Sequence, residues 1–399
     1  MPSVSASIHR FRLVADPEVS IVMPCLNEAD TLATCIGKAN AALDGAVIHG
    51  EIIVADNGST DGSVEIATRE GARVVPVTAR GDGAALMGGI AAARGRFVIM
   101  GDADDSYDFG EVPKFVERLR QGFDLVQGCR LESGGGRVLP GAMPFLHRWL
   151  GNPMFSVLAR NWFRAPIHDV YCGMRGFRRD FVHQLDQRCT GMEFATEMVI
   201  KASLTQARIA EVPITLHPDG RKAHPPHLKT FRDGWRTLRF FLLYCPRQLF
   251  LVPGVMLAVL GLFGYLIALP GARIGGVTFD AHTLLFASLA IITGYQSACF
   301  AIFAKTFAIS EGLLPADLHL ERFRRMVTLE RGLIGGAFLG LLGLLLLGGA
   351  VNEWRMHAFG LLDYAQTMRL VIPGVTLSVL GFQTVLSCFF LSLLDLRRC

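Results

Sequence analysis

The sequence predicts an α/β domain built on a mostly parallel sheet, followed by a membrane domain of four helices. Over the first 215 residues, short apolar runs alternate with longer runs of helical pattern, as in sheets wound from alternating strands and helices. Apolar residues make up 51% of the chain, which is high for a soluble protein. Four nearly uncharged runs account for the excess, and all of them lie in the C-terminal part.

Each element of the α/β domain can be justified in order. The expected strands are short, apolar and bounded by polar or glycine-containing turns, and they span 19–24, 51–56, 73–77, 97–101 and 124–128. The expected helices lie between them and span 31–43, 61–70, 82–94 and 111–120. Because ligands of such sheets bind at the carboxyl ends of the strands, polar residues that directly follow a strand are the first candidates for a functional site.

The four C-terminal runs are each about 20 residues or longer, enough to cross roughly 30 Å of hydrocarbon as a helix. They span about 250–269, 284–304, 333–351 and 370–394. Lys and Arg gather before the first run and between the second and third, which places these segments and both termini in the cytosol. We therefore expect an integral membrane protein, of the bacterial inner membrane, whose N-terminal domain is cytosolic.

The domain boundaries follow from these shifts in composition. The expected parts are a tail (1–18), the α/β domain (19–227), an interfacial amphipathic helix (228–248) and the membrane domain (249–399). Aromatic and basic residues are mixed in 144–164 and again in 228–247, which is typical of helices in the membrane interface. The net charge of +4 gives no indication of a nucleic-acid partner, and nine cysteines without a C-x-x-C pair predict no zinc site or disulfide framework.

The stretch MGDADDSYDF, residues 100–109, places four carboxylates directly after the fourth expected strand. Like charges this close repel each other, and burying them is costly unless a cation neutralises them. Asp102 and Asp104 are two residues apart, and hard divalent cations prefer such oxygen ligands, with a diphosphate completing the coordination. An acidic turn without a metal is the alternative, and Asp108 could equally cap the next helix. The position at a strand end favours the metal site.

Polar residues also follow the first two strands. Asn27 and Glu28 come after the first strand, and Asp56 and Asn57 come after the second. A carboxylate at such a place can accept hydrogen bonds from a nucleobase or a ribose hydroxyl. Gly83 opens the helix at 82–94, where a small residue lets the backbone approach an anion, although close helix packing explains it equally well.

In combination these motifs resemble the family 2 glycosyltransferases of GT-A fold. The resemblance is closest to the membrane-anchored polyprenyl-phosphate branch, which includes dolichol-phosphate mannose and glucose synthases, and it covers residues 19–250. The stretches that carry it are VSIVMPCLNEADTL (19–32), IIVADNGSTDGS (52–63), GDGAALMGGIAAARGRFVIMGDADDSYDF (81–109), DVYCGMRGFRRD (169–180), GMEFATEMVIKA (191–202) and HPDGRKAHPPHLKTFRDGWRTLRFFL (217–242).

The resemblance, with the strand-end positions, implies roles for individual residues. Asp102 and Asp104 are expected to hold Mg²⁺ or Mn²⁺, with Ser106 as a further metal-side ligand where family members often carry an amide. Asp169 matches an acidic position that the family has at the sugar end of its donor-binding cleft. The expected catalytic residues are therefore Asp102, Asp104 and Asp169. The alternative for Asp169 is that it caps the turn before the expected strand at 170–178. The expected nucleotide-sugar site comprises Pro24, Asn27, Glu28, Asp56, Asn57, Gly83, Asp102 and Ala103.

A polyprenyl-phosphate acceptor explains why no general base is conspicuous. The second pKa of such a phosphate is near roughly 6, so the acceptor is largely dianionic at neutral pH and needs no deprotonation. It needs positive charge to hold it in line, and guanidinium forks suit phosphate oxygens. The candidates for binding the acceptor phosphate are Arg130, Arg148, Arg175, Arg221 and Lys222.

We expect an inverting transferase that moves glucose or mannose from a UDP- or GDP-linked donor to a polyprenyl phosphate at the cytosolic membrane face. Another lipid acceptor, diacylglycerol or ceramide, is left open, and Asp169 is then the candidate base. A non-catalytic membrane scaffold is the alternative of a different class, against which Asp56, Asp102 and Asp104 argue. A processive polysaccharide synthase is disfavoured, because Phe145 stands where its Q-x-x-R-W motif has Gln. The oligomeric state is left open, including a homo-oligomer.

Overall fold

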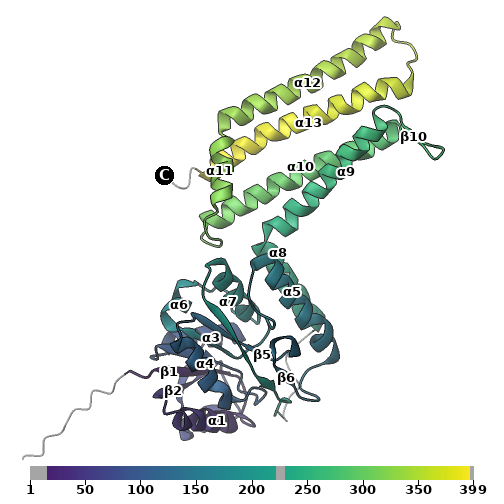
Figure 1. The fold of residues 1–399 in the computed structure, drawn as a ribbon. Helices are drawn as coiled ribbons and strands as arrows, with labels where there is room; N and C mark the ends of the chain where they lie inside the picture. The colour runs from purple at the N-terminus through teal and green to yellow at the C-terminus, as the bar shows by residue number, and fades with distance from the viewer. Residues whose placement is uncertain (1–15, 222–229, 396–399) are drawn as a thin grey trace, which may run out of the picture. The chain divides into compact units, whose positions relative to one another are not determined.

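The computed structural model describes residues 16–221 and 230–395 (Figure 1). The chain divides into two compact units, Met1–Phe240 and Phe241–Cys399. The first unit contains the sheet and its covering helices, and the second contains the long apolar helices. Each unit is described by itself.

The first unit is built on a seven-stranded sheet with the strand order β3-β2-β1-β4-β7-β5-β8. β1 pairs in parallel with both β2 and β4, β2 with β3, and β5 with β8, whereas β7 runs antiparallel to its neighbours β4 and β5. The prediction of a mostly parallel sheet is therefore confirmed. The strands are β1 (Val19–Cys25), β2 (Gly50–Asp56), β3 (Arg73–Pro76), β4 (Phe97–Met100), β5 (Leu125–Cys129), β7 (Arg175–Arg178) and β8 (Ile209–Pro213), with a separate short pair of β6 (Arg137–Val138) and β9 (Thr215–Leu216).

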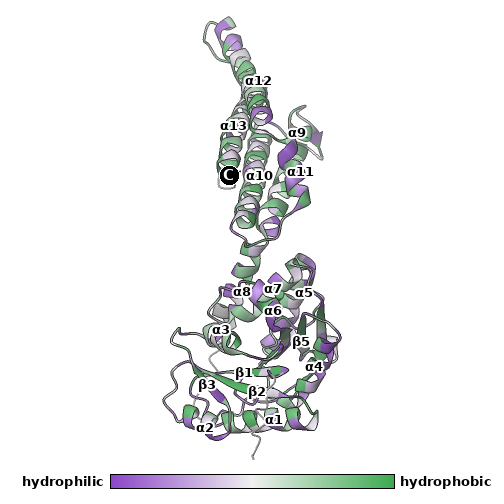
Figure 2. Cartoon of the chain, turned by 90° about the vertical axis from the view of Figure 1, so that its left-hand side faces the viewer, coloured by the Kyte–Doolittle hydropathy of each residue, from purple (hydrophilic) through white to green (hydrophobic). Residues whose placement is uncertain are grey.

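Helices cover both faces of this sheet, with α1 and α2 on one face and α3, α6 and α7 on the other (Figure 2). The four helices expected from the sequence are found as α1 to α4, with ends shifted by a few residues. The helices of the unit are α1 (Leu32–Gly45), α2 (Ser63–Arg69), α3 (Asp82–Ala92), α4 (Val112–Arg120), α5 (Asn152–Phe163), α6 (Arg179–Gln184), α7 (Glu193–Leu204) and α8 (Thr230–Tyr244). The last of these extends a few residues into the second unit.

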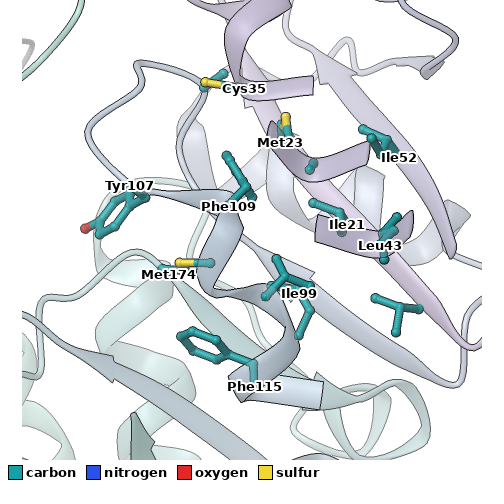
Figure 3. Close-up of a cluster of buried hydrophobic side chains, with 14 of the residues drawn as sticks. Ile21, Met23, Cys35, Leu43, Ile52, Ile99, Tyr107, Phe109, Phe115 and Met174 are labelled. Atoms are coloured by element: carbon teal, nitrogen blue, oxygen red, sulfur yellow. The ribbon is translucent and has the colours of Figure 1, made fainter. Parts of the chain in front are cut away.

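The core follows from the alternation of side chains along β1. Ile21 and Met23 point to the face covered by α1 and join the main apolar cluster, whereas Val22 contacts α3 on the opposite face. A Cβ atom at Gly89 of α3 would lie 2.5 Å from Cγ1 of Val22, so glycine allows this helix to pack close to the sheet. Figure 3 shows the main cluster, whose labelled members include Ile21, Met23, Leu43, Ile52, Ile99, Tyr107, Phe109, Phe115 and Met174.

The register of the parallel strands brings three polar loops to one edge of the sheet. Cys25 at the end of β1 pairs with Asp56 at the end of β2, and Met100 at the end of β4 pairs with Val22. The segments that follow, which begin at residues 26, 57 and 101, therefore leave the sheet side by side. This is the edge at which the sequence predicts the functional site.

In the described part of the second unit, up to residue 395, four helices are long and apolar enough to cross a membrane, as expected. They are η4 with α9 (Arg247–Ala268), α10 (Ala281–Ser310), α12 (Leu329–Met356) and α13 (Tyr364–Asp395), and each is longer than the apolar run within it. α9 packs against α10 and α12 against α13 (Figure 1), with α11 (Leu318–Met326) between the two pairs in sequence. Glycines permit close contact, because a Cβ atom at Gly261 would lie 2.5 Å from the Ala287 carbonyl oxygen.

Candidate active site at the carboxyl edge of the sheet

Two asparagines tie the strand-end loops together. Asn27 follows β1 and has a positive φ of 60°. Its backbone N–H donates to Ser59 Oγ at 2.9 Å, and its side-chain Oδ1 accepts from the Thr60 N–H at 2.8 Å. Asn57 Nδ2 donates to the carbonyls of Val77 and Ala79, and its Oδ1 accepts from the Gly81 N–H at 2.9 Å. Both donors of the Asn57 amide and one bond of its oxygen thus shape the loop, and its predicted contact with the nucleotide stays a prediction.

Three further residues predicted for the nucleotide site, Pro24, Asp56 and Gly83, lie at strand ends or at the start of α3. Pro24 and Asp56 are buried at the ends of β1 and β2, and the Asp56 carboxylate accepts from the Gly58 N–H at 3.1 Å and the Ser59 N–H at 3.2 Å. Their predicted roles stay predictions. Gly83 is explained by packing instead, since a Cβ atom there would lie 2.7 Å from the carbonyl oxygens of Cys189 and Gly191.

The turn Asp102-Ala103-Asp104 that follows β4, called here the D-x-D turn, is held in place by hydrogen bonds from neighbouring segments. Thr31 Oγ1 donates to the carbonyl of Ala103 at 2.6 Å, which fixes the middle of the turn. The backbone N–H of Ser106 donates to Asp104 Oδ1 at 3.0 Å, and its hydroxyl donates to the same oxygen at 2.6 Å. Ser106 therefore orients Asp104, and its role as a metal ligand stays a prediction. Asp105, the next carboxylate, forms an ion pair with Lys38 at 2.7 Å.

Burial and neighbouring carboxylates raise the pKa of two aspartates at this edge, Asp102 and Asp82. Burial, with the charges of Asp104 and Asp82, raises the pKa of Asp102 well above its usual value. Burial and Asp104 likewise raise the pKa of Asp82, the first residue of α3, to about 6. Ionisation of both aspartates is thus disfavoured, and a cation bound beside them would favour their charged forms. Among the described residues, however, no three His, Cys, Asp or Glu side chains are placed to hold a metal ion by themselves.

Arg221 reaches this acidic edge from the segment after β9. Its guanidinium group donates to Asp104 Oδ2 at 3.0 Å, to Glu28 Oε1 at 3.2 Å and to Asp219 Oδ2 at 2.6 Å. Burial opposes ionisation, but the three carboxylates raise the pKa of Arg221 above its usual value, so the group stays charged. Arg221 was predicted to bind the acceptor phosphate, and that role stays a prediction. The structure places it against Asp104, predicted to hold the metal, and Glu28, predicted for the nucleotide sugar.

Arg130 and Asp169, which the sequence analysis assigned to acceptor binding and to catalysis, form a buried ion pair with each other. Arg130 Nε and Nη2 donate to the two Asp169 oxygens at 2.7 and 2.9 Å, and the backbone N–H of Arg130 adds a third bond at 3.0 Å. The Asp169 side chain is fully buried. Both of its oxygens are therefore engaged, which argues against Asp169 as a general base and against Arg130 as a free phosphate ligand.

Tyr107 extends this pair toward the D-x-D turn. Its hydroxyl accepts from Arg130 Nη1 at 3.2 Å and from the Gly173 N–H at 2.8 Å. A Cβ atom at Gly173 would lie 3.0 Å from Asp102 Oδ2, so this loop lies directly against the acidic turn. The ion pair and Tyr107 together form a brace that positions the loop beside Asp102.

The remaining residues predicted to bind the acceptor phosphate differ in their surroundings. Arg175 is fully buried and donates to the carbonyls of Val170, Cys172 and Ala195, and burial lowers its pKa to about 10. Its observed partners are backbone carbonyls, which favours a structural role, and its predicted contact with the acceptor phosphate stays a prediction. Arg148 forms an ion pair with Glu132 at 2.8 Å near the surface, and its role stays a prediction. Lys222 lies outside the described residues.

Two residues at this site were missed by the sequence analysis. Tyr107 lies inside the quoted acidic stretch, but nothing in the sequence indicates its partners at positions 130 and 173. Asp219 holds Arg221 through both of its oxygens, at 2.6–3.0 Å. The spacing of two residues between an acid and an arginine was the available signal, and it is too common in loops to be specific.

Comparison with known proteins identifies the family. Residues 20–186 match the family model for glycosyl transferase family 2, and residues 302–395 match the model for the glycosyltransferase family 2 C-terminal transmembrane region. A low-salt glycan biosynthesis hexosyltransferase of Haloferax volcanii is 38% identical over 94% of this chain and 88% of its own length. A dolichyl-phosphate hexose transferase of the same organism is 32% identical over 54% of this chain and 89% of its own.

Among solved structures, a glucosyl-3-phosphoglycerate synthase of Mycobacterium tuberculosis, crystallised with Mn²⁺, UDP and its product, aligns with a TM-score of 0.44. It is 23% identical and covers 57% of this chain and 80% of that one. The two family matches, the relative that spans nearly the whole chain, and the mostly parallel sheet followed by four apolar helices agree with the GT-A architecture implied by the resemblance. The chain belongs to glycosyltransferase family 2 and is a membrane-anchored glycosyltransferase.

Proposed function

We propose that this glycosyltransferase moves a hexose from a nucleotide sugar to the phosphate of a polyprenol, in a metal-dependent and inverting reaction at the cytosolic membrane face. The observation that carries the proposal is the buried ion pair of Asp169 with Arg130. Asp169 is the acidic residue assigned as base for an alcohol acceptor, and its carboxylate is buried and held on both oxygens by Arg130. A phosphate acceptor needs no base, because it is already ionised at neutral pH.

The donor is proposed to bind over the loops after β1, β2 and β4. Glu28 and Asp56 are assigned to the nucleoside end, and Asp102 and Asp104 to the diphosphate end, because they follow the ends of β1, β2 and β4. Carboxylate oxygens suit Mg²⁺ or Mn²⁺. Burial and the neighbouring charges of Asp104 and Asp82 raise the pKa of Asp102, and a bound cation would oppose that shift. Such a cation, when bound, offsets the charge that develops on the leaving diphosphate.

The name of one relative supports a lipid-phosphate acceptor. The Haloferax protein that is 32% identical over 54% of this chain is called a dolichyl-phosphate hexose transferase, and dolichyl phosphate is a polyprenyl phosphate. The four apolar helices of this chain are consistent with an acceptor that resides in the membrane. The identity of the hexose and of the nucleotide is not indicated by any residue of the site.

The membrane face of the first unit is proposed to include the π-helical turn η3 (His147–Gly151) and α5. Large apolar side chains are exposed at helical spacing along this segment, and Arg148, Arg160 and Arg164 flank them without any acidic residue between 144 and 164. This pattern suits the headgroup region of a membrane. The exposed apolar residues are Phe145, Leu146, Trp149, Leu150, Met154 and Val157.

The test uses the purified full chain with undecaprenyl phosphate and Mg²⁺. UDP-glucose, UDP-galactose, UDP-N-acetylglucosamine and GDP-mannose are supplied separately as radiolabelled donors, and the organic phase is counted. We expect label from one hexose donor with the wild type and none with Asp104→Ala. If a protein shown to bind nucleotide transfers no label from any donor, the polyprenyl-phosphate assignment is wrong.

A further inference from the structure

Arg221 occupies a place between the two ends of the proposed donor site. Its guanidinium group contacts Glu28 at the nucleoside end and Asp104 at the diphosphate end, at 3.2 and 3.0 Å. The third contact, with Asp219, lies on its own segment at 2.6 Å. The side chain of Arg221 is only 12% exposed, so these bonds are largely shielded from water and are stronger than those of a surface pair.

These contacts leave little of Asp104 available to another cation. Oδ1 accepts two hydrogen bonds from Ser106, at 2.6 and 3.0 Å, and Oδ2 accepts from Arg221. Direct ligation of a divalent cation by Asp104 needs a carboxylate oxygen. Oδ1 is held in part by a backbone N–H, whereas Oδ2 is held by the side chain of Arg221. A metal ion and Arg221 therefore compete for the same oxygen.

The backbone keeps Arg221 beside the acidic turn whichever way its side chain points. The segment before it runs antiparallel to the D-x-D turn: the His217 N–H donates to the Ser106 carbonyl, and the Gly220 N–H donates to the Asp104 carbonyl, each at 2.9 Å. A guanidinium group that leaves Asp104 stays within reach of a diphosphate bound there. Arginine forks match phosphate oxygens as well as carboxylates, so an anionic donor offers Arg221 a new partner.

We propose that Arg221 is the internal counter-ion of the donor site: it holds Asp104 and Glu28 when no donor is bound, and it transfers to the donor diphosphate when a divalent cation takes Asp104. The inference rests on the proposed function, since it takes a metal and a nucleoside diphosphate as the ligands. Two opposite effects follow from it. Arg221 weakens binding of the metal alone and strengthens binding of the nucleotide with the metal.

The experiment measures both affinities on the full chain in detergent. Free Mn²⁺ is followed by its electron paramagnetic resonance signal, first without nucleotide and then in titrations with UDP and with GDP. Arg221→Gln is expected to bind Mn²⁺ alone about tenfold more tightly than the wild type, because one charge-assisted hydrogen bond no longer opposes it. The same variant is expected to bind the nucleotide in the presence of Mn²⁺ about tenfold more weakly.

The matched control is Arg120→Gln. Arg120 pairs with Glu18 through two nitrogens, each at 2.7 Å, in the same fork geometry but away from the site, and this substitution should leave both affinities unchanged. Arg221→Lys keeps the charge but lacks the planar fork, in which Nη1 reaches Glu28 and Nη2 reaches Asp104. Its Mn²⁺ affinity should therefore fall between those of the wild type and Arg221→Gln. Arg221→Lys carries the test if Arg221→Gln does not fold.

The outcomes separate the inference from the proposed function. Suppose that Asp104→Asn abolishes Mn²⁺ binding, but neither Arg221 variant binds Mn²⁺ more tightly than the wild type. The metal site then stands, and Arg221 is only a structural brace. If the wild type and all variants bind no Mn²⁺ with or without nucleotide, the metal-dependent donor site and the counter-ion role are both wrong.

Discussion

Asp169→Ala should destabilise the first unit by about 3–5 kcal/mol, because it leaves the buried Arg130 guanidinium group without its carboxylate. Arg130 is 8% exposed and Asp169 is fully buried, and three of the N–H groups of Arg130 donate to that carboxylate. After truncation the Tyr107 hydroxyl is the one side-chain partner that remains for Arg130 among residues 16–221 and 230–395. For a unit of this size, each kcal/mol corresponds to about 2–4 °C, so the melting temperature should fall by about 6–20 °C.

The assay is thermal unfolding of the full chain in detergent, followed by tryptophan fluorescence, to which Trp149, Trp162 and Trp235 of the first unit contribute. Glu18→Ala is the control: it breaks the Arg120–Glu18 fork, which has the same geometry but an arginine that is 51% exposed, and should cost under about 1 kcal/mol. If Asp169→Ala shifts the melting temperature no more than Glu18→Ala does, the account of a structural ion pair is refuted.

Three further changes test neighbouring parts of the account. Tyr107→Phe should lower the free energy of unfolding by about 1–3 kcal/mol, because it leaves Arg130 Nη1 and the Gly173 N–H without their shared acceptor, and urea unfolding measures this. Gly83→Ala should lower the free energy of unfolding by about 1–3 kcal/mol in the same assay, since its Cβ atom would lie 2.7 Å from two carbonyl oxygens. Gly37→Ala on α1 is the control and should not lower it, because no atom lies within 4 Å of the added Cβ atom. Asp82→Asn should raise the melting temperature at pH 7.5. The folded pKa of Asp82, about 6, exceeds its usual 3.8, so ionisation costs stability as the pH rises through this window, and the gain should vanish near pH 4. An equal gain at both pH values would contradict that origin.

The sheet and the place of the site could be predicted from the sequence because both depend on local patterns. Short apolar runs such as VSIVMP and FVIM have the length and composition of buried strands, and the intervening segments have helical spacing. Once the strands are parallel, their carboxyl ends must lie along one edge, so Asp56 and Asp102 come together without any knowledge of contacts. The membrane helices were predictable from length and apolarity alone.

The partners within the site could not be predicted, because they join residues far apart in the sequence. Arg130 and Asp169 are both suitable for catalysis when considered singly, and only the structure shows that they neutralise each other across β5 and the segment before β7. Arg221 likewise has the chemistry of a phosphate ligand, but its position beside Asp104 depends on backbone pairing between residues 217–220 and the D-x-D turn. Charge and residue type indicate chemistry, whereas the fold decides which charges remain available to a ligand.

The most direct test of the central claim is a comparison of acceptors. The purified full chain, with Mg²⁺ and the radiolabelled donor that it accepts, is supplied with undecaprenyl phosphate, with undecaprenol and with diacylglycerol at equal concentrations. The account predicts label on the phosphate only, because Asp169, the residue expected to act as base for an alcohol, is held on both oxygens by Arg130. Transfer to undecaprenol or diacylglycerol that is lost in Asp169→Asn would contradict it and make Asp169 the base.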